Sequence, residues 1–162
     1  MKRIYILRHG KAEDGYGKSD FERELIPKGK KKTIKVAQYL KENNIVPQKI
    51  LASMAQRTIQ TAEVMSDILS ISKDAILVEK SLYLASSNSI LDVLYGVDDQ
   101  IQELMLIGHN PGLSSLATYL AGKEIDWMPT SGLVGVEIQI DKWTDISGPL
   151  SHLLFYIKPN DL

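Results

Sequence analysis

Two stretches of the chain, residues 4–7 and 104–107, contain only large apolar side chains, without any alternation of apolar and polar positions. Successive side chains of a strand point to opposite faces of a sheet, so such a run indicates a strand that is covered on both faces. Strands of this kind belong to parallel sheets that carry helices on each side. The two runs therefore predict an α/β fold.

Helical spacing of apolar residues between and after these runs supports the same fold. Four stripes repeat at i, i+3, i+4 and i+7: Thr33, Val36, Ala37 and Leu40; Thr61, Val64, Met65 and Ile68; Ile90, Val93, Leu94 and Val97; Leu113, Leu116, Ala117 and Leu120. Pro27 suits the first turn of the first helix. Asn110 and Pro111 are candidates for the N-cap and first position of the last helix, and Gly122 for its end.

Shorter runs complete the predicted sheet. Residues 49–53 and 75–79 are further candidate strands, and residues 133–140 and 152–159 flank a turn-rich segment, which is typical of two paired strands. We therefore expect one domain over residues 1–162. Its architecture is expected to be a three-layer α/β/α arrangement, with a mostly parallel sheet and antiparallel edge strands at the C-terminus.

Composition narrows the possible partners. Nineteen Lys and Arg residues oppose 20 Asp and Glu residues, and a net charge of −1 offers no general attraction to nucleic acid or an anionic membrane. Cysteine is absent, which excludes disulfides, thiol catalysis and cysteine-based zinc sites. The N-terminal apolar segment is too short for a signal peptide, and no stretch approaches the roughly 18 apolar residues of a membrane span. A cytoplasmic protein is expected.

The ends of the predicted strands concentrate unusual side chains. Arg8 and His9 directly follow the first apolar run, and His109 closely follows the second. In open α/β sheets, ligands bind beyond the carboxyl ends of the parallel strands. If the two strands are neighbours, His9 and His109 meet at one rim, and Arg57 reaches the same rim from behind residues 49–53. The sequence predicts a cluster of two imidazoles and two guanidiniums.

This cluster suits phosphoryl chemistry. Arginine binds phosphate oxygens through two parallel hydrogen bonds, and a neutral imidazole is a competent nucleophile. The second histidine, if protonated, can donate to the phosphoryl oxygens. Residue types alone do not decide which histidine attacks. A zinc site from His9, His109 and a carboxylate is the weaker interpretation, because Arg8 repels a cation. His152, without a basic neighbour, is interpreted as structural.

Four segments resemble motifs of the histidine phosphatase superfamily. "LRHGKAE" resembles its R-H-G signature, "SMAQRTIQTA" its S-x-x-x-R-x-x-Q-T-A segment, and "LIGHNPGLSSLATYLAG" its second histidine motif. "SDFERELIPKGKKK" is similar to a D-x-x-R-x-L-T-x-x-G element of the SixA-like branch, the phosphohistidine phosphatases. Met54, Thr58 and Ile26 stand where the family usually has Pro, Ala and Thr.

The resemblance implies specific roles. It makes His9 the nucleophile that becomes a phosphohistidine, and it makes Arg8, Arg57 and His109 the groups that bind the phosphoryl group. It also implies a mixed sheet with flanking helices, with no metal or organic cofactor. The implied partner is a phosphorylated protein, specifically a domain that bears phosphohistidine.

The sequence does not identify the residue that would act as general acid. Other branches supply a carboxylate between the two motifs, where "EKSLYLASSNS" offers only Glu79, outside the matching stretch. A phosphoramidate nitrogen can be protonated before its bond to phosphorus breaks, so we expect phosphohistidine to be a better substrate than phosphoserine or a sugar phosphate. Glu13 and Asp20, in the first loop, are the candidates if an acid exists.

Two other functions remain open from the sequence alone. A small-molecule phosphomonoesterase of the same superfamily would use the same four residues with different pocket walls. A non-catalytic module would bind phosphorylated ligands through Arg8 and Arg57 without turnover. The lysine cluster at residues 28–32 is interpreted as a solvated helix face. The sequence does not decide whether it also docks an acidic partner.

Overall fold

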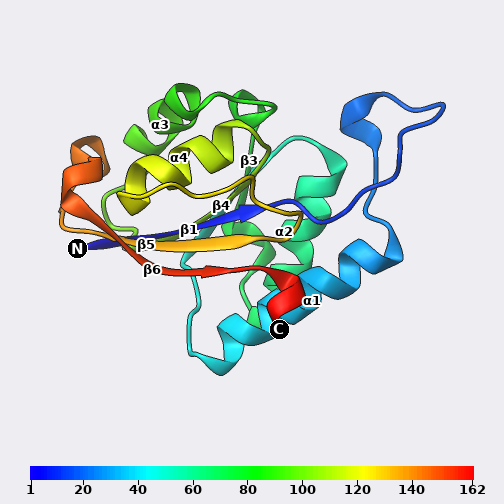
Figure 1. Ribbon diagram of the computed structural model, residues 1–162, viewed down its shortest axis with the longest axis horizontal. Coiled ribbons are helices and arrows are strands. Elements are labelled where there is room, and N and C mark those ends of the chain that lie inside the picture. Colours follow the sequence, from blue (N-terminus) through cyan, green and yellow to red (C-terminus); the bar gives the residue numbers. More distant parts are fainter.

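A six-stranded sheet runs through the centre of the computed structural model, which describes residues 1–162 (Figure 1). The strand order across the sheet is β3-β2-β4-β1-β5-β6. The strands are β1 (Lys2–Arg8), β2 (Lys49–Ser53), β3 (Ile76–Glu79), β4 (Glu103–Gly108), β5 (Leu133–Ile138) and β6 (Ser151–Ile157).

The first four strands are parallel to one another, and the last two are antiparallel. β1 pairs with β4, β4 with β2, and β2 with β3 in parallel, whereas β5 runs antiparallel to β1 and β6 antiparallel to β5. This topology confirms the predicted mostly parallel sheet with antiparallel strands from the C-terminal part of the chain. It also makes β1 and β4 direct neighbours, which the site prediction required.

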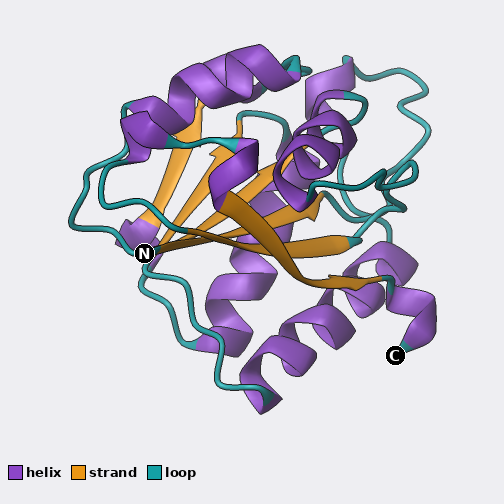
Figure 2. Cartoon of the chain, turned by 60° about the vertical axis from the view of Figure 1, so that its left-hand side comes forward, coloured by secondary structure: helices purple, strands orange, loops and turns teal.

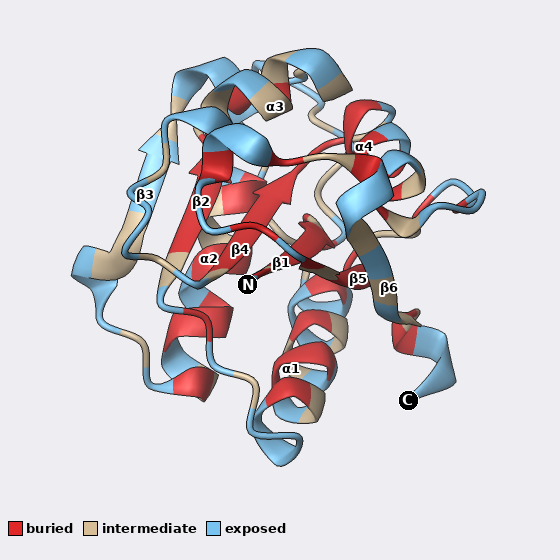
Figure 3. Ribbon diagram, turned by 90° about the vertical axis from the view of Figure 1, so that its left-hand side faces the viewer, coloured by how far each residue is buried: buried red, intermediate tan, exposed pale blue.

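Helices cover both faces of the sheet (Figure 2). α1 (Pro27–Glu42) and α2 (Gln56–Leu69) pack on one face, and α3 (Ser87–Tyr95) and α4 (Gly112–Ala121) pack on the other. The central strand β1 shows why its sequence lacks alternation. Ile4 and Ile6 belong to the core beneath α3 and α4, while Tyr5 and Leu7 belong to the core beneath α1 and α2. Figure 3 shows this buried centre of the sheet.

The element types agree with the sequence prediction, but several ends differ: β5 ends at Ile138 and β6 at Ile157, each two residues earlier than expected, and Val97 lies beyond the end of α3. α1 begins with Pro27 in its first turn, and Gly122 ends α4 in the left-handed conformation with φ of 68°. α4, however, begins at Gly112, so Pro111 precedes the helix instead of opening it. The Asn110 side chain still caps this end, because its Oδ1 accepts from the Ser114 amide at 3.2 Å. None of the helices has the length and apolarity needed to cross a lipid bilayer.

Candidate active site

The sheet register brings the two motif histidines to the same edge. Arg8 of β1 pairs with Gly108 of β4, so His9 and His109 are each the first residue beyond their strand. Their ring centroids are 5.3 Å apart, and both side chains are buried. The predicted convergence of His9 and His109 is confirmed, because parallel neighbours end on the same side of the sheet.

Arg57 reaches this edge from the first turn of α2. Its side chain is almost completely buried, and its Nη2 lies 3.4 Å from His109 Nδ1. A guanidinium only donates hydrogen bonds, so Nδ1 of His109 accepts and the ring proton resides on Nε2. Nε2 in turn donates to Ser53 Oγ at 2.8 Å, from the end of β2. The imidazole of His109 is therefore oriented from both of its nitrogens.

His9 is oriented with one free nitrogen. Its Nδ1–H donates to the Gly10 carbonyl at 2.8 Å, which leaves the lone pair on Nε2. The pKa of His9 is lowered to about 3, chiefly by burial; the Gly10 hydrogen bond opposes this, and the neighbouring His109, Arg57 and Arg8 add to the lowering. At neutral pH the His9 imidazole is uncharged, as nucleophilic attack through Nε2 requires.

His109 is also neutral in the unliganded protein. Burial lowers its pKa to about 4, and the positive charge of Arg57 is the next cause. The sequence alone allows a protonated second histidine. In the folded protein without a bound anion, the imidazolium form of His109 is therefore absent near neutral pH. A bound dianion would favour the charged imidazole, because opposite charges at short range raise a histidine pKa.

These lowered pKa values predict the pH response of both histidines. In the unfolded chain each imidazole takes up a proton near pH 6.5, whereas in the folded protein it does so only near pH 3 to 4. The native state thus binds fewer protons, and stability is lost as pH falls from about 6.5. NMR titration of the Cε1–H resonances is expected to show both rings neutral at pH 5.5. A midpoint above 6 for either ring would contradict this expectation.

Two buried guanidinium donors lack partners. Arg8 Nη1 donates to the Met128 carbonyl at 2.9 Å, but the Nε atoms of Arg8 and Arg57 are buried without any hydrogen-bond partner. A buried donor without a partner is costly and rare in folded proteins. Two such cationic donors beside two imidazoles form a site that is chemically suited to an anion with several oxygens.

Asp20, in the loop between β1 and α1, contacts Arg57. Its Oδ2 lies 3.0 Å from Arg57 Nη2 and also accepts from the Tyr83 hydroxyl, while its Oδ1 accepts from Arg23 Nη1 at 2.9 Å. The Tyr83 hydrogen bond, followed by those of Arg23 and Arg57, holds the pKa of Asp20 well below its usual range. This carboxylate is ionised near neutral pH and has no proton to donate.

Glu13 lies apart from the histidines. Its carboxylate accepts from Lys18 Nζ at 2.8 Å and from the Glu24 amide at 2.8 Å, on the exposed loop. Its hydrogen bond with Lys18 is the main reason that its pKa is lowered. Of the two carboxylates considered from the sequence, the fold brings only Asp20 to the cluster.

Tyr83 and Ser53 were not anticipated as site residues. The Tyr83 ring meets the His109 ring edge-on, with centroids 5.5 Å apart and planes at 89°, and its hydroxyl reaches Asp20. Nothing in the local sequence distinguishes Tyr83 from a packing residue. Ser53 lies inside a quoted motif, but only the contact with His109 reveals its orienting role.

Close backbone contacts hold the segment after β1. A Cβ on Gly29 of α1 would lie 2.2 Å from the Lys11 carbonyl oxygen, so only glycine permits this approach. The Gly10 amide donates to Thr61 Oγ1 of α2 at 3.0 Å. The Ser131 amide, in turn, donates to the carbonyls of Arg8 and His9. Three separate elements therefore position the backbone around His9.

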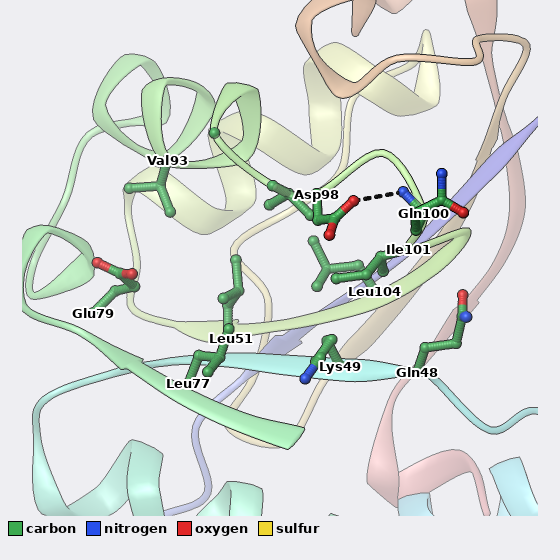
Figure 4. Close-up of a pocket in the computed structure, with 12 residues that line it drawn as sticks. Gln48, Lys49, Leu51, Leu77, Glu79, Val93, Asp98, Gln100, Ile101 and Leu104 are labelled. Carbon is green, nitrogen blue, oxygen red and sulfur yellow. Dashed lines mark hydrogen bonds between the residues drawn. The ribbon is translucent and has the colours of Figure 1, made fainter. Parts of the chain in front are cut away.

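Other potential sites lack this chemistry. No three His, Asp or Glu side chains are grouped at a spacing that would hold a metal ion. A cavity of about 520 Å³ lies against α3 and the amino ends of β2 and β4 (Figure 4). Lys49 is the one cationic residue among those that line it, and no arginine or histidine does. The histidine cluster follows the carboxyl end of β4, at the other end of that strand.

A family model and a bacterial relative match this chain. The model of the histidine phosphatase superfamily (branch 1) matches residues 4–83. An uncharacterized protein of Mycobacterium tuberculosis is 26% identical over 94% of this chain and 99% of its own length.

Solved structures provide a second comparison. A protein of Agrobacterium tumefaciens, described as a candidate phosphohistidine phosphatase SixA, is 26% identical and superposes with a TM-score of 0.82 over 98% of both chains. A protein histidine phosphatase SixA, solved with tungstate, has the same fold, with a TM-score of 0.83 at 21% identity over 98% of both chains. Together with the family match and the convergence of both motif histidines, these similarities show that the chain belongs to the histidine phosphatase superfamily and is SixA-like within it.

Proposed function

We propose that this chain is a phosphohistidine phosphatase that works through a covalent phospho-His9 intermediate. The observation that carries the proposal is the neutral His9, whose Nε2 lone pair is free beside two buried guanidiniums with unpartnered Nε donors. His9 Nε2 attacks phosphorus, the substrate P–N bond breaks, and the departing imidazole nitrogen leaves carrying a proton. Water then attacks phospho-His9, which releases inorganic phosphate and restores the neutral imidazole.

Arg8, Arg57 and His109 are assigned to the phosphoryl oxygens. The two arginines offer the Nε donors that lack partners in the unliganded protein. His109 offers Nδ1, which faces Arg57 and carries no proton before the anion binds. The incoming negative charge favours protonation there, and the imidazolium then stabilises the charge that accumulates on the oxygens in the transition state.

Asp20 is assigned to orienting Arg57 and not to proton donation. Its ionised carboxylate and its backbone carbonyl hold both terminal nitrogens of the Arg57 guanidinium, at 3.0 and 2.8 Å. With Glu13 paired to Lys18 on the loop, no carboxylic acid is in place to protonate a leaving alkoxide. This arrangement favours a substrate whose leaving nitrogen takes its proton from solvent.

A substrate comparison tests the proposal. General acid assistance contributes roughly 10²- to 10⁴-fold to a reaction that needs it. We therefore expect kcat/KM for a phosphohistidine peptide to exceed that for a matched phosphoserine peptide by about 100-fold or more. Phosphate release is measured for both peptides and for sugar phosphates under identical conditions. Faster turnover of the serine or sugar esters would make the protein a small-molecule esterase of the superfamily, and binding without turnover would make it a phospholigand-binding module.

A further inference from the structure

The N-terminal half of α1 carries a concentrated and unpaired positive charge. Lys28, Lys31, Lys32 and Lys35 follow one another at i, i+3, i+4 and i+7, and we call these four residues the lysine face. This spacing places them on one side of the helix, away from its buried stripe. The lysine ion pairs of the structure engage Lys18, Lys73 and Lys158, and none involves the lysine face.

The first of these charges, Lys28, is in a position that is unfavourable for the helix itself. The amino end of a helix has a partial positive charge, so cations there are destabilising and acidic side chains are normally preferred. α1 has no acidic residue in its first turn, and Ile26 at its N-cap provides no side-chain cap. The dipole therefore disfavours Lys28, the one lysine of this face in the first turn, and its presence there is consistent with recognition of an anionic surface.

The helix that carries the lysine face packs next to the candidate active site through its buried side. The Ile26 amide donates to the Lys11 carbonyl at 3.0 Å, two residues beyond His9, and Gly29 packs directly on the same residue. One turn later, Thr33 Oγ1 is 2.8 Å from Ser131 Oγ, and the Ser131 amide donates to the His9 carbonyl. The first two turns of α1 are therefore part of the wall around His9.

A groove extends from the lysine face along the surface. It has a volume of about 370 Å³ and is lined by Lys32, Trp127, Pro129 and Lys158, with Asp161 as its one acidic residue. Trp127 is 62% exposed, and the neighbouring Met128 carbonyl holds Arg8. Lys158 is already paired with Asp126 at 2.7 Å, so Lys32 and Asp161 are the unpaired charges of this groove.

We propose that the lysine face docks the acidic surface surrounding the phosphohistidine of a protein substrate. The inference rests on the proposed function and names the charge of the partner, which the catalytic cluster itself does not specify. Complementary charge raises the rate of encounter and orients the partner, and both effects weaken as salt screens the charges. The occupant is thus a phosphoprotein with carboxylates flanking its phosphohistidine.

Three phosphohistidine peptides test this docking, identical except that the flanking positions carry Glu, Gln or Lys. For the natural protein we expect kcat/KM to favour the Glu peptide over the Gln peptide by roughly tenfold at low salt, with the preference lost near 0.5 M salt. The Lys28→Glu/Lys31→Glu variant is expected to lose this preference and to favour the Lys peptide. An unchanged Glu preference in this variant would overturn the proposal.

Lys30 provides the matched control on the same helix. It lies on the opposite flank, beside Glu63 and Asp67 of α2, so Lys30→Gln removes one α1 charge without touching the lysine face. We expect this variant to keep the Glu preference, and an equal loss in Lys30→Gln would overturn the proposal. The melting temperature gives a separate measurement of the charge at Lys28. Lys28→Glu replaces a cation in the first turn of the helix with an anion, so we expect the melting temperature to rise by about 1–3 °C.

Failure of the catalytic proposal is distinguishable from failure of docking. If neither the peptides nor phosphoramidate are hydrolysed, the proposed function is wrong, and binding of the same labelled peptides by fluorescence anisotropy still tests the docking. The Lys28→Gln/Lys31→Gln variant serves if the charge reversal does not fold. Tighter binding of duplex DNA or of phosphatidylserine vesicles than of the Glu peptide would overturn the proposed partner.

Discussion

The His9→Ala variant is expected to lose phosphohistidine hydrolysis by roughly 10⁴-fold or more, because it removes the atom that carries the phosphoryl group between the two half-reactions. In the natural protein, Nε2 is the one nitrogen of His9 that makes no hydrogen bond, since Nδ1 donates to the Gly10 carbonyl. Neither His109 nitrogen is free in the same way, because Ser53 and Arg57 engage both. His109 is therefore not expected to take over.

Rapid quenching in alkali measures this prediction directly. Acid-labile phosphate is expected on His9 of the natural protein during turnover, and no phosphoprotein is expected from His9→Ala. His152→Ala is the matched control, because His152 lies on β6 with its side chain exposed and is expected to retain activity. Trapped phosphate on His109, or substantial turnover by His9→Ala, would move the nucleophile elsewhere. A phospholigand-binding module would instead show affinity without turnover in both proteins.

Arg57→Lys is expected to lower kcat by roughly 10²- to 10³-fold, although the positive charge is kept. The guanidinium of Arg57 uses both terminal nitrogens on Asp20, places Nη2 near His109 and still has a buried Nε donor unpartnered. A lysine ammonium cannot reproduce this planar set of donors. The lysine would also form fewer hydrogen bonds with Asp20 than Arg57 does. The Asp20 carboxylate would then be less well neutralised and would repel the phosphoryl group of the substrate.

Steady-state kinetics with a phosphohistidine peptide measure the size of this loss and its division between kcat and KM. Arg3→Lys is the matched control, since Arg3 lies near the other end of β1, partly exposed and paired with Glu137. That variant is expected to stay within about twofold of the natural protein, as surface ion pairs contribute little. If kcat of the Arg57→Lys variant stays within threefold of that of the natural protein, Arg57 does not make the proposed transition-state contacts.

The fold was largely predictable because its signals are local. Continuous apolar runs identified β1 and β4, and residues spaced by three and four positions identified all four helices. The start of α4 was misplaced by one residue, since Asn110 caps the helix through Ser114 from a position outside it. Sequence patterns give the type of an element more reliably than its ends, where capping geometry decides.

The sequence by itself determined the double-sided sheet and the placement of Arg8, His9 and His109 at strand ends, because those features depend on hydrophobic periodicity within a few residues. Tertiary structure alone decided that Asp20 is bound to Arg57 and Tyr83, which lie 37 and 63 positions away, and that these contacts lower its pKa further. It also decided that both histidines are neutral, that Nε2 of His9 is free, and that both nitrogens of His109 are engaged. Protonation follows from burial and from charges contributed by other elements, and these exist only once the chain has folded.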